Sequence, residues 1–241
     1  MHRALFIFII FLATGYSCIA QQGVTTFGLQ VKPIIPNRLI GTYEQEFNAL
    51  PFQSTVKQRM GFSAGMVVRV GLTDRISLET GLNFTRRNFG LSYALPDSGY
   101  AETGKVRVVS YSLPLSGLVY IRLSDEWYMN TSLGVALTAF PSDVQTFIGV
   151  GPNQRFQQEG AYKSKIQGAA LANVGFEYRT KSSGYWYIGA SYHLPFVPIM
   201  TFAMSFEYEG GNLLAIDNIR GSYLTLDLRY FFHESKKSDN R

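Results

Sequence analysis

Ser191 and His193 are the residues whose types and spacing come closest to a catalytic arrangement. They stand two positions apart, so in a β-strand both side chains would lie on the same face. A serine–histidine pair can hydrolyse lipids when a carboxylate orients the imidazole. The candidate carboxylates Glu177 and Asp227 are expected nearer the opposite end of their strands from His193. No complete triad is evident, and we predict that the protein is not an enzyme and has no catalytic residues.

Metal and cofactor chemistry has little support in the sequence. His2, His193 and His233 fall in three different regions of the chain, so no metal-binding cluster is expected. Gly61 and Gly65 recur inside an apolar segment, as close strand packing requires, and not in a phosphate-binding loop. The net charge is +5, with the basic residues scattered, which argues against nucleic-acid binding. We therefore predict no metal site, no cofactor and no nucleic-acid partner.

A larger set of charged residues alternates with apolar residues along several segments. Alternate residues of a strand share a face, so these charged side chains are expected to point into one common interior. Charges in a narrow interior persist mainly as pairs, and arginine can bind a carboxylate through two hydrogen bonds. We predict a lumen plugged by ion pairs, with a narrow polar conduit as the alternative. The predicted lumen network consists of Arg59, Arg69, Glu79, Arg87, Arg122, Glu177, Asp227 and Arg229.

The segment near the C-terminus indicates the kind of fold that would hold such an interior. Leu224, Leu226 and Leu228 lie on one face of a strand, whereas Asp227 and Arg229 lie on the other. An outer-membrane β-barrel turns the apolar face to lipid and the polar face to its lumen. A soluble lipocalin-like barrel is the competing interpretation, but it would turn its apolar face inward. The alternation therefore favours the membrane barrel.

Composition agrees with this interpretation. Hydrophobic residues make up 46% and aromatic residues 15% of the 241 positions, while charged residues reach only 16%. Ordinary soluble domains contain roughly 25% charged residues. Beyond the N-terminal segment no run of 18 apolar residues occurs, so membrane-spanning helices are not expected. We predict an all-β fold, an eight-stranded antiparallel transmembrane β-barrel in the outer membrane of a Gram-negative-type bacterium.

The N-terminal segment is typical of a secretory signal peptide. Arg3 supplies positive charge, residues 4–13 form a short apolar core, and cleavage is expected after Ala20. Lipidation at Cys18 is the alternative, although its preceding residues fit a lipoprotein signal poorly. Cleavage after Ala20 would leave a mature chain without cysteine. The predicted organisation is a signal peptide at 1–20, a barrel at 21–233 and a polar periplasmic tail at 234–241.

Short turns and long loops alternate along the rest of the chain. Strands are expected at residues 25–32, 57–72, 75–89, 105–123, 127–140, 162–179, 185–196 and 221–232. Pro114 predicts a bulge or bend in the fourth strand, and the loop at 197–220 alternates enough to form a hairpin extension. Outer-membrane barrels place short turns and both termini in the periplasm. A periplasmic aromatic girdle is expected from Trp127, Trp186, Tyr230 and Phe232.

The segment Tyr111–Tyr120, with Pro114 and Leu115 inside it, resembles the fourth strand of the PorT-like outer-membrane barrels. The overall layout is similar to eight-stranded barrels of the OmpA and OmpW type. The resemblance implies a structural or interaction role, such as an accessory role in type IX secretion. A narrow conduit for small or hydrophobic solutes, of the OmpW type, is the alternative, and a lipid-modifying enzyme is a third class. The implied partners are outer-membrane lipid, the barrel-assembly machinery and an envelope protein.

Three cations interrupt the outward apolar face at one end of two neighbouring strands. Arg86 follows the outward residues of one strand, and Lys105 and Arg107 precede those of the next. A charge on the lipid-facing wall costs about 0–1 kcal/mol near the interface and roughly 2–4 kcal/mol at the midplane. We therefore predict that these cations lie at headgroup height and contact lipopolysaccharide phosphates. Pairing with the loop acids Asp97 or Glu102 is the alternative.

Overall fold

The computed structural model describes residues 25–37, 43–49, 51–141, 143–151, 154–180, 183–208 and 210–232. The expected signal peptide and the polar tail lie outside these residues. Within the described ranges, no helix is long and apolar enough to cross a membrane.

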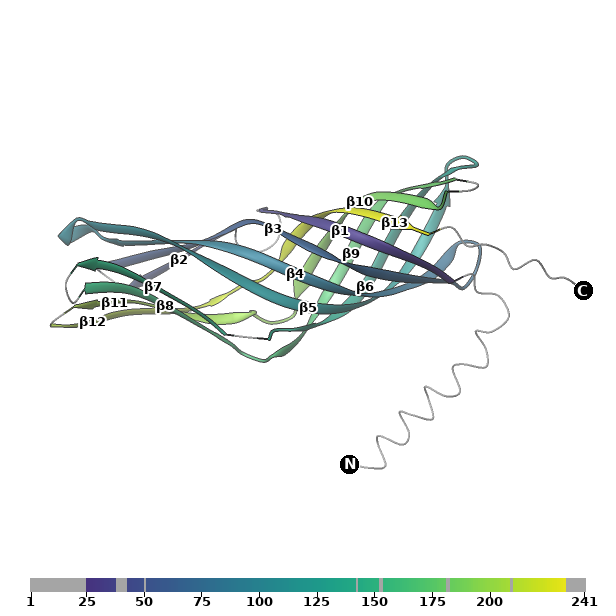
Figure 1. Ribbon diagram of the computed structural model, residues 1–241. Coiled ribbons are helices and arrows are strands. Elements are labelled where there is room, and N and C mark those ends of the chain that lie inside the picture. The colour runs from purple at the N-terminus through teal and green to yellow at the C-terminus, as the bar shows by residue number, and fades with distance from the viewer. Residues whose placement is uncertain are drawn as a thin grey trace, which may run out of the picture.

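Eight strands close into a ring, each antiparallel to both of its neighbours (Figure 1). In chain order they are β1 (Thr25–Ile35), β3 (Phe52–Gly71), β4 (Ile76–Leu95), β5 (Tyr100–Arg122), β6 (Trp127–Ala139), β9 (Ile166–Arg179), β10 (Tyr185–Pro195) and β13 (Tyr223–Phe231). β1 pairs with both β13 and β3, which leaves the ring without a free edge. The ring confirms the predicted eight-stranded antiparallel β-barrel.

The wall of the ring is apolar outside and polar inside. On β1, Phe27 and Leu29 are more than half exposed, whereas Gln30 and Lys32, which point the other way, are buried. Leu133 on β6 is 73% exposed, and Asp227 on β13 is 0% exposed. This is the reverse of a soluble barrel, and it follows from the period-two alternation of the sequence.

Short turns join the strands at one end of the ring, which we call the short-turn end. In the turn between β3 and β4, the Thr73 hydroxyl accepts the backbone N–H of Ile76 at 3.0 Å. The four girdle residues lie on the outer face at this end. Trp186 packs on Tyr230 with ring centroids 4.7 Å apart, and Tyr230 on Phe232 at 5.4 Å. Trp127 packs on Tyr178 at 5.0 Å.

At the opposite end, the hairpin end, the expected loops are largely strands. β3, β4 and β5 continue past the ring, and β2 (Glu44–Ala49) pairs with β3. A second sheet of order β12-β11-β8-β7 faces them (Figure 1). Its strands are β7 (Val144–Gly151), β8 (Gln154–Tyr162), β11 (Met200–Tyr208) and β12 (Gly211–Ile219). Long loops were expected between the predicted strands, at about 33–55, 90–104 and 141–160; that expectation is wrong, because most of the described residues there lie in strands. The hairpin expected at 197–220 is present as β11 and β12.

This hairpin extension has an apolar interior, unlike the ring. Phe156 of β8 packs on Tyr93 of β4 with centroids 5.0 Å apart, and on Phe206 of β11 at 4.8 Å. Aromatic side chains of this size each bury about 150–250 Å², which is enough to hold two small sheets together. On the inner face of β4 the lining changes from polar to apolar between two residues. Arg87 is the last charged residue, and Phe89 is the first residue of the apolar core.

A β-bulge in β3 lies at this same level. Arg59 pairs with Asn88, but the next pair is Phe62 with Arg86, so β3 contains one extra residue there. The bulge reverses which positions face inward, and Arg59 consequently lies on the outer surface and is exposed. Its prediction as a lumen residue is wrong for that reason. At Pro114 a bulge or a bend was expected; the β4–β5 ladder is interrupted there without a change of register, so there is no bulge.

Candidate functional site

A layer of charged side chains from β1, β3, β4, β9 and β13 fills the half of the ring nearer the short turns. At its centre Glu79 accepts hydrogen bonds from two guanidinium groups. Arg69 donates from Nη2 to Oε2 at 3.0 Å, and Arg229 from Nη1 to Oε1 at 2.5 Å. All three side chains are buried, so each charge depends on its partners more than on water. We call the whole layer the charged septum; its members are Lys32, Arg69, Glu79, Glu177, Arg179, Asp227 and Arg229.

Asp227 anchors one side of the charged septum. Its carboxylate accepts hydrogen bonds from Arg229 at 2.7 Å, from Ser191 at 2.6 Å and from Thr225 at 2.6 Å. Lys32 forms an ion pair with the same carboxylate at 3.2 Å. A carboxylate with this many donors retains its charge in a fully buried position.

Glu177 anchors the other side. Its two oxygens bind different arginines, Arg69 at 2.5 Å and Arg179 at 2.6 Å. The guanidinium of Arg69 also lies over the ring of Phe231, 4.0 Å from its centroid. The charged septum therefore contains four cations and three carboxylates, joined across five strands by side chains alone.

The structure brings together five of the eight predicted lumen residues: Arg69, Glu79, Glu177, Asp227 and Arg229. Arg122 does not join them, because it sits at the short turn after β5 and pairs with Asp125 at 2.5 Å with its side chain 62% exposed. Its prediction as a network member is wrong, since the strand ends there. Arg59 is outside the wall because of the bulge.

Arg87 faces the interior but stands apart from the charged septum. It is 3% exposed, and its Nη1 donates to the backbone oxygen of Gly221 at 2.8 Å. Its guanidinium lies 5.3 Å from the ring centroid of Tyr223. Among the described residues it forms no ion pair with a carboxylate, and its Nε has no hydrogen-bond partner. The prediction that Arg87 belongs to the ion-paired network is therefore wrong, although the side chain faces the interior as expected.

Lys32 is the functional residue that sequence reasoning missed. It lies at the end of the expected first strand, whose inward and outward positions were not assigned. The signal was present, since Gln30 and Lys32 alternate with outward Leu29 and Val31. Period-two alternation along β1 places Lys32 on the inner face, and the register of β1 with β13 brings it beside Asp227.

Three hollow spaces follow one another along the barrel. A vestibule of about 880 Å³ opens at the short-turn end and is lined by Arg69, Arg75, Arg122, Arg179 and Asp74 among others. A cavity of about 20 Å³ lies beside Lys32 and Asn83 within the charged septum. Another of about 20 Å³ lies beyond it, between Arg87, Phe140 and His193. Each small cavity is large enough for about one water molecule.

Ser191 and His193 do face the same interior, but their contacts differ from those of a catalytic pair. The Ser191 hydroxyl donates to Asp227 and so is not held by the imidazole. His193 stacks on Tyr223, with centroids 4.4 Å apart. Within the described ranges, no group of three or more His, Cys, Asp or Glu side chains could hold a metal ion.

Comparison with known proteins bears on the fold. No protein-family profile and no curated protein sequence matches the chain. Among solved structures, the outer membrane protein OprG from Pseudomonas aeruginosa is similar with a TM-score of 0.52 and 13% identity, over 87% of this chain and 96% of OprG. The fold is that of an outer-membrane β-barrel.

Two further solved structures are more distant. An outer membrane channel from Pseudomonas putida F1 matches with a TM-score of 0.21 and 12% identity, over 86% of this chain and 94% of the channel. The β domain of the Bordetella autotransporter BrkA matches with a TM-score of 0.23 and 10% identity, over 88% of this chain and 99% of that domain. The closed ring and the similarity to OprG together identify the fold.

Proposed function

We propose that the protein resides in the outer membrane and forms a narrow conduit for small solutes, closed in the conformation described here. The exposed apolar wall would face lipid, and the fold shared with OprG supports this location. The short-turn end would face the periplasm and the hairpin extension the outside, as is usual for such barrels.

The three successive hollow spaces carry this proposal. The vestibule, the cavity in the charged septum and the cavity at Arg87 are separated from one another by side chains. Side chains change rotamers on picosecond to nanosecond timescales when free, and collective rearrangements take microseconds to milliseconds. A path through this barrel could therefore open without breaking the backbone ladder.

The charges along this path favour anions. Four arginines, Arg69, Arg75, Arg122 and Arg179, and one acid, Asp74, line the vestibule. Arg69 and Arg179 bind carboxylates of the charged septum and Arg122 binds Asp125, so the positive excess is the one cation by which the four cations of the charged septum outnumber its three carboxylates. Low-dielectric walls focus such an excess of one charge and concentrate counter-ions. Beyond the charged septum, Arg87 offers a guanidinium without a carboxylate partner among the described residues, next to Phe140. The best solute would be a small carboxylate that carries an apolar group.

Flux into proteoliposomes tests the conduit. We expect small aliphatic and aromatic carboxylates to enter faster than amines of the same size. Arg87→Gln should reduce this preference, whereas Lys163→Gln, which removes an exposed cation outside the barrel interior, should leave it unchanged. The absence of flux for both solute classes above protein-free vesicles would contradict the proposal.

An interaction role, including the PorT-like role in secretion, is a second candidate supported by one observation. On β12, an edge strand of the second sheet, Leu214 and Ile216 lie on the same face and are 47% and 61% exposed, and Phe147 on the opposite edge strand β7 is 55% exposed. Exposed apolar side chains far from the ring would suit contact with an envelope protein. Site-specific photo-crosslinking from position 147 in cells should trap one partner repeatedly, and crosslinking from position 97 at the opposite hairpin tip is the control.

A further inference from the structure

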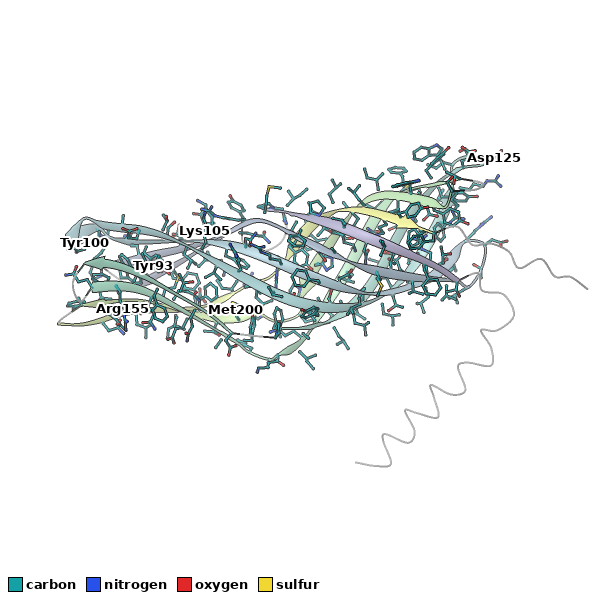
Figure 2. The ribbon with its side chains drawn as sticks, in the orientation of Figure 1. Tyr93, Tyr100, Lys105, Asp125, Arg155 and Met200 are labelled. Carbon is teal, nitrogen blue, oxygen red and sulfur yellow. The ribbon has the colours of Figure 1, made fainter. Side chains whose placement is uncertain are left out.

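A cluster of cations occupies the outer wall where the ring meets the hairpin extension. Arg59 of β3, Arg86 of β4, and Lys105 and Arg107 of β5 belong to three adjacent strands. Arg59 and Arg107 both pair with Asn88 of the central strand, from opposite sides. We call these four residues the cation shelf. Figure 2 shows Lys105 on the outside of the molecule, between the ring and the hairpin tip at Tyr100.

The bulge in β3 is what completes the cation shelf. Without the extra residue, Arg59 would point into the interior, as strict alternation predicts. Its guanidinium instead lies against Gly90: a Cβ built there would come within 2.5 Å of Arg59 Nε. A side chain at position 90 would therefore push Arg59 out of its present place.

The cation shelf surrounds a hollow that lacks acidic residues. The hollow has a volume of about 390 Å³, and all four cations line it together with Met60, Asn88 and two apolar residues. None of the four forms an ion pair within the described part of the chain, including with Asp97 or Glu102. The nearby Lys57 is different, because it pairs with Glu44 at 2.8 Å. Four uncompensated cations in one hollow make a site for an anion.

Aromatic side chains form a row directly next to the cation shelf, on the side of the ring. Phe62, Phe84 and Tyr111 belong to the same three strands, with ring centroids 6.0 Å and 5.7 Å apart in succession. Beyond them the wall is apolar, with Met66 and Leu82 more than half exposed. Aromatic rows of this kind mark the interface between lipid and the polar headgroups in barrels.

We propose that the cation shelf and the aromatic row bind a phosphorylated glycolipid of the outer leaflet, namely lipopolysaccharide. The phosphates would lie on Arg59, Arg86, Lys105 and Arg107, and the acyl chains on the aromatic row. Arginine suits this role because its planar guanidinium can donate two hydrogen bonds to one phosphate. A soluble protein partner fits less well, because the aromatic row continues into the lipid-facing wall. The proposal relies on the outward orientation of the hairpin extension and is independent of conduction.

A charge-removal series tests this site. The test variant replaces Arg86, Lys105 and Arg107 with Gln. The matched control makes the same change at Lys163, Lys165 and Arg220. These three cations are exposed and lie outside the cation shelf. Binding of purified lipopolysaccharide to the full-length barrel is measured by native mass spectrometry, and the melting temperature is compared in lipopolysaccharide and phosphatidylglycerol bilayers. We expect binding to fall at least about tenfold in the test variant, equivalent to about 1.4 kcal/mol, and to remain near wild type in the control.

Further arms keep the outcome interpretable. Arg86→Lys with Arg107→Lys retains the charge and should keep most of the binding, which separates the loss of charge from poor folding of the test variant. Dephosphorylated lipopolysaccharide should bind the wild type and the test variant equally weakly. Equal losses in the test and control variants, or equal binding of phosphatidylglycerol and lipopolysaccharide, would overturn the proposal. Solute flux should be the same in all variants, so a failed conduit and a failed lipid site give different results.

Discussion

Glu79 joins two arginines of the charged septum, so its loss should be strongly destabilising. Glu79→Ala would leave Arg69 without one partner and Arg229 with Asp227 alone, both in buried positions. Removing one member of a buried ion pair costs about 3–5 kcal/mol. We expect this loss in the free energy of unfolding, measured by reversible urea denaturation in lipid. Glu44→Ala, which breaks the exposed pair with Lys57, should cost less than about 1 kcal/mol.

Alternation alone places Glu79, Asp227 and Arg229 inside the barrel, because each lies in a long strand with an unbroken period of two. It fails for Arg59, because an extra residue in a β-strand leaves no mark in the pattern of residue types. It also fails for the pairing of Arg87. The sequence shows that this arginine faces inward, but not that the interior becomes apolar just beyond it.

The ring strands and the hairpin extension differ in how well the sequence predicts them. The ring strands have one apolar and one polar face, and short turns join β3 to β4, β5 to β6 and β9 to β10. The extension has proline at its edges, as in Pro36 and Pro141, which is typical of loops. Its core forms only when segments from four hairpins meet, and that long-range packing is not visible in a single segment.

The close approach of β3 and β4 depends on Gly65. A Cβ added there would lie 2.1 Å from the backbone oxygen of Leu82 and 2.8 Å from Cα of Asn83, neither of which can move alone. Gly65→Ala should therefore destabilise the barrel by about 1–3 kcal/mol, as overpacking does. Gly117→Ala is the matched control, since nothing lies within 4 Å of its Cβ position. Similar urea midpoints for the two variants would contradict this account of the β3–β4 contact.

At the scale of the whole molecule, a closed ring with every strand paired should resist unfolding in detergent. We expect the unheated protein to migrate faster than the boiled protein on a denaturing gel, because the ring would remain folded until it is heated. Cell fractionation should recover it with the outer membrane. Recovery in the soluble periplasmic fraction, or identical migration before and after boiling, would be inconsistent with a membrane barrel.

The central claim is that the chain crosses the outer membrane with its hairpin extension outside and its short turns inside. Single cysteines test it directly, since the one native cysteine lies in the expected signal peptide. Asp97→Cys lies at a hairpin tip, and Asp125→Cys lies in a short turn where the native side chain is 94% exposed. A membrane-impermeant maleimide should label position 97 in intact cells, and position 125 only after the outer membrane is permeabilised. Labelling of position 125, but not of position 97, in intact cells would contradict the account.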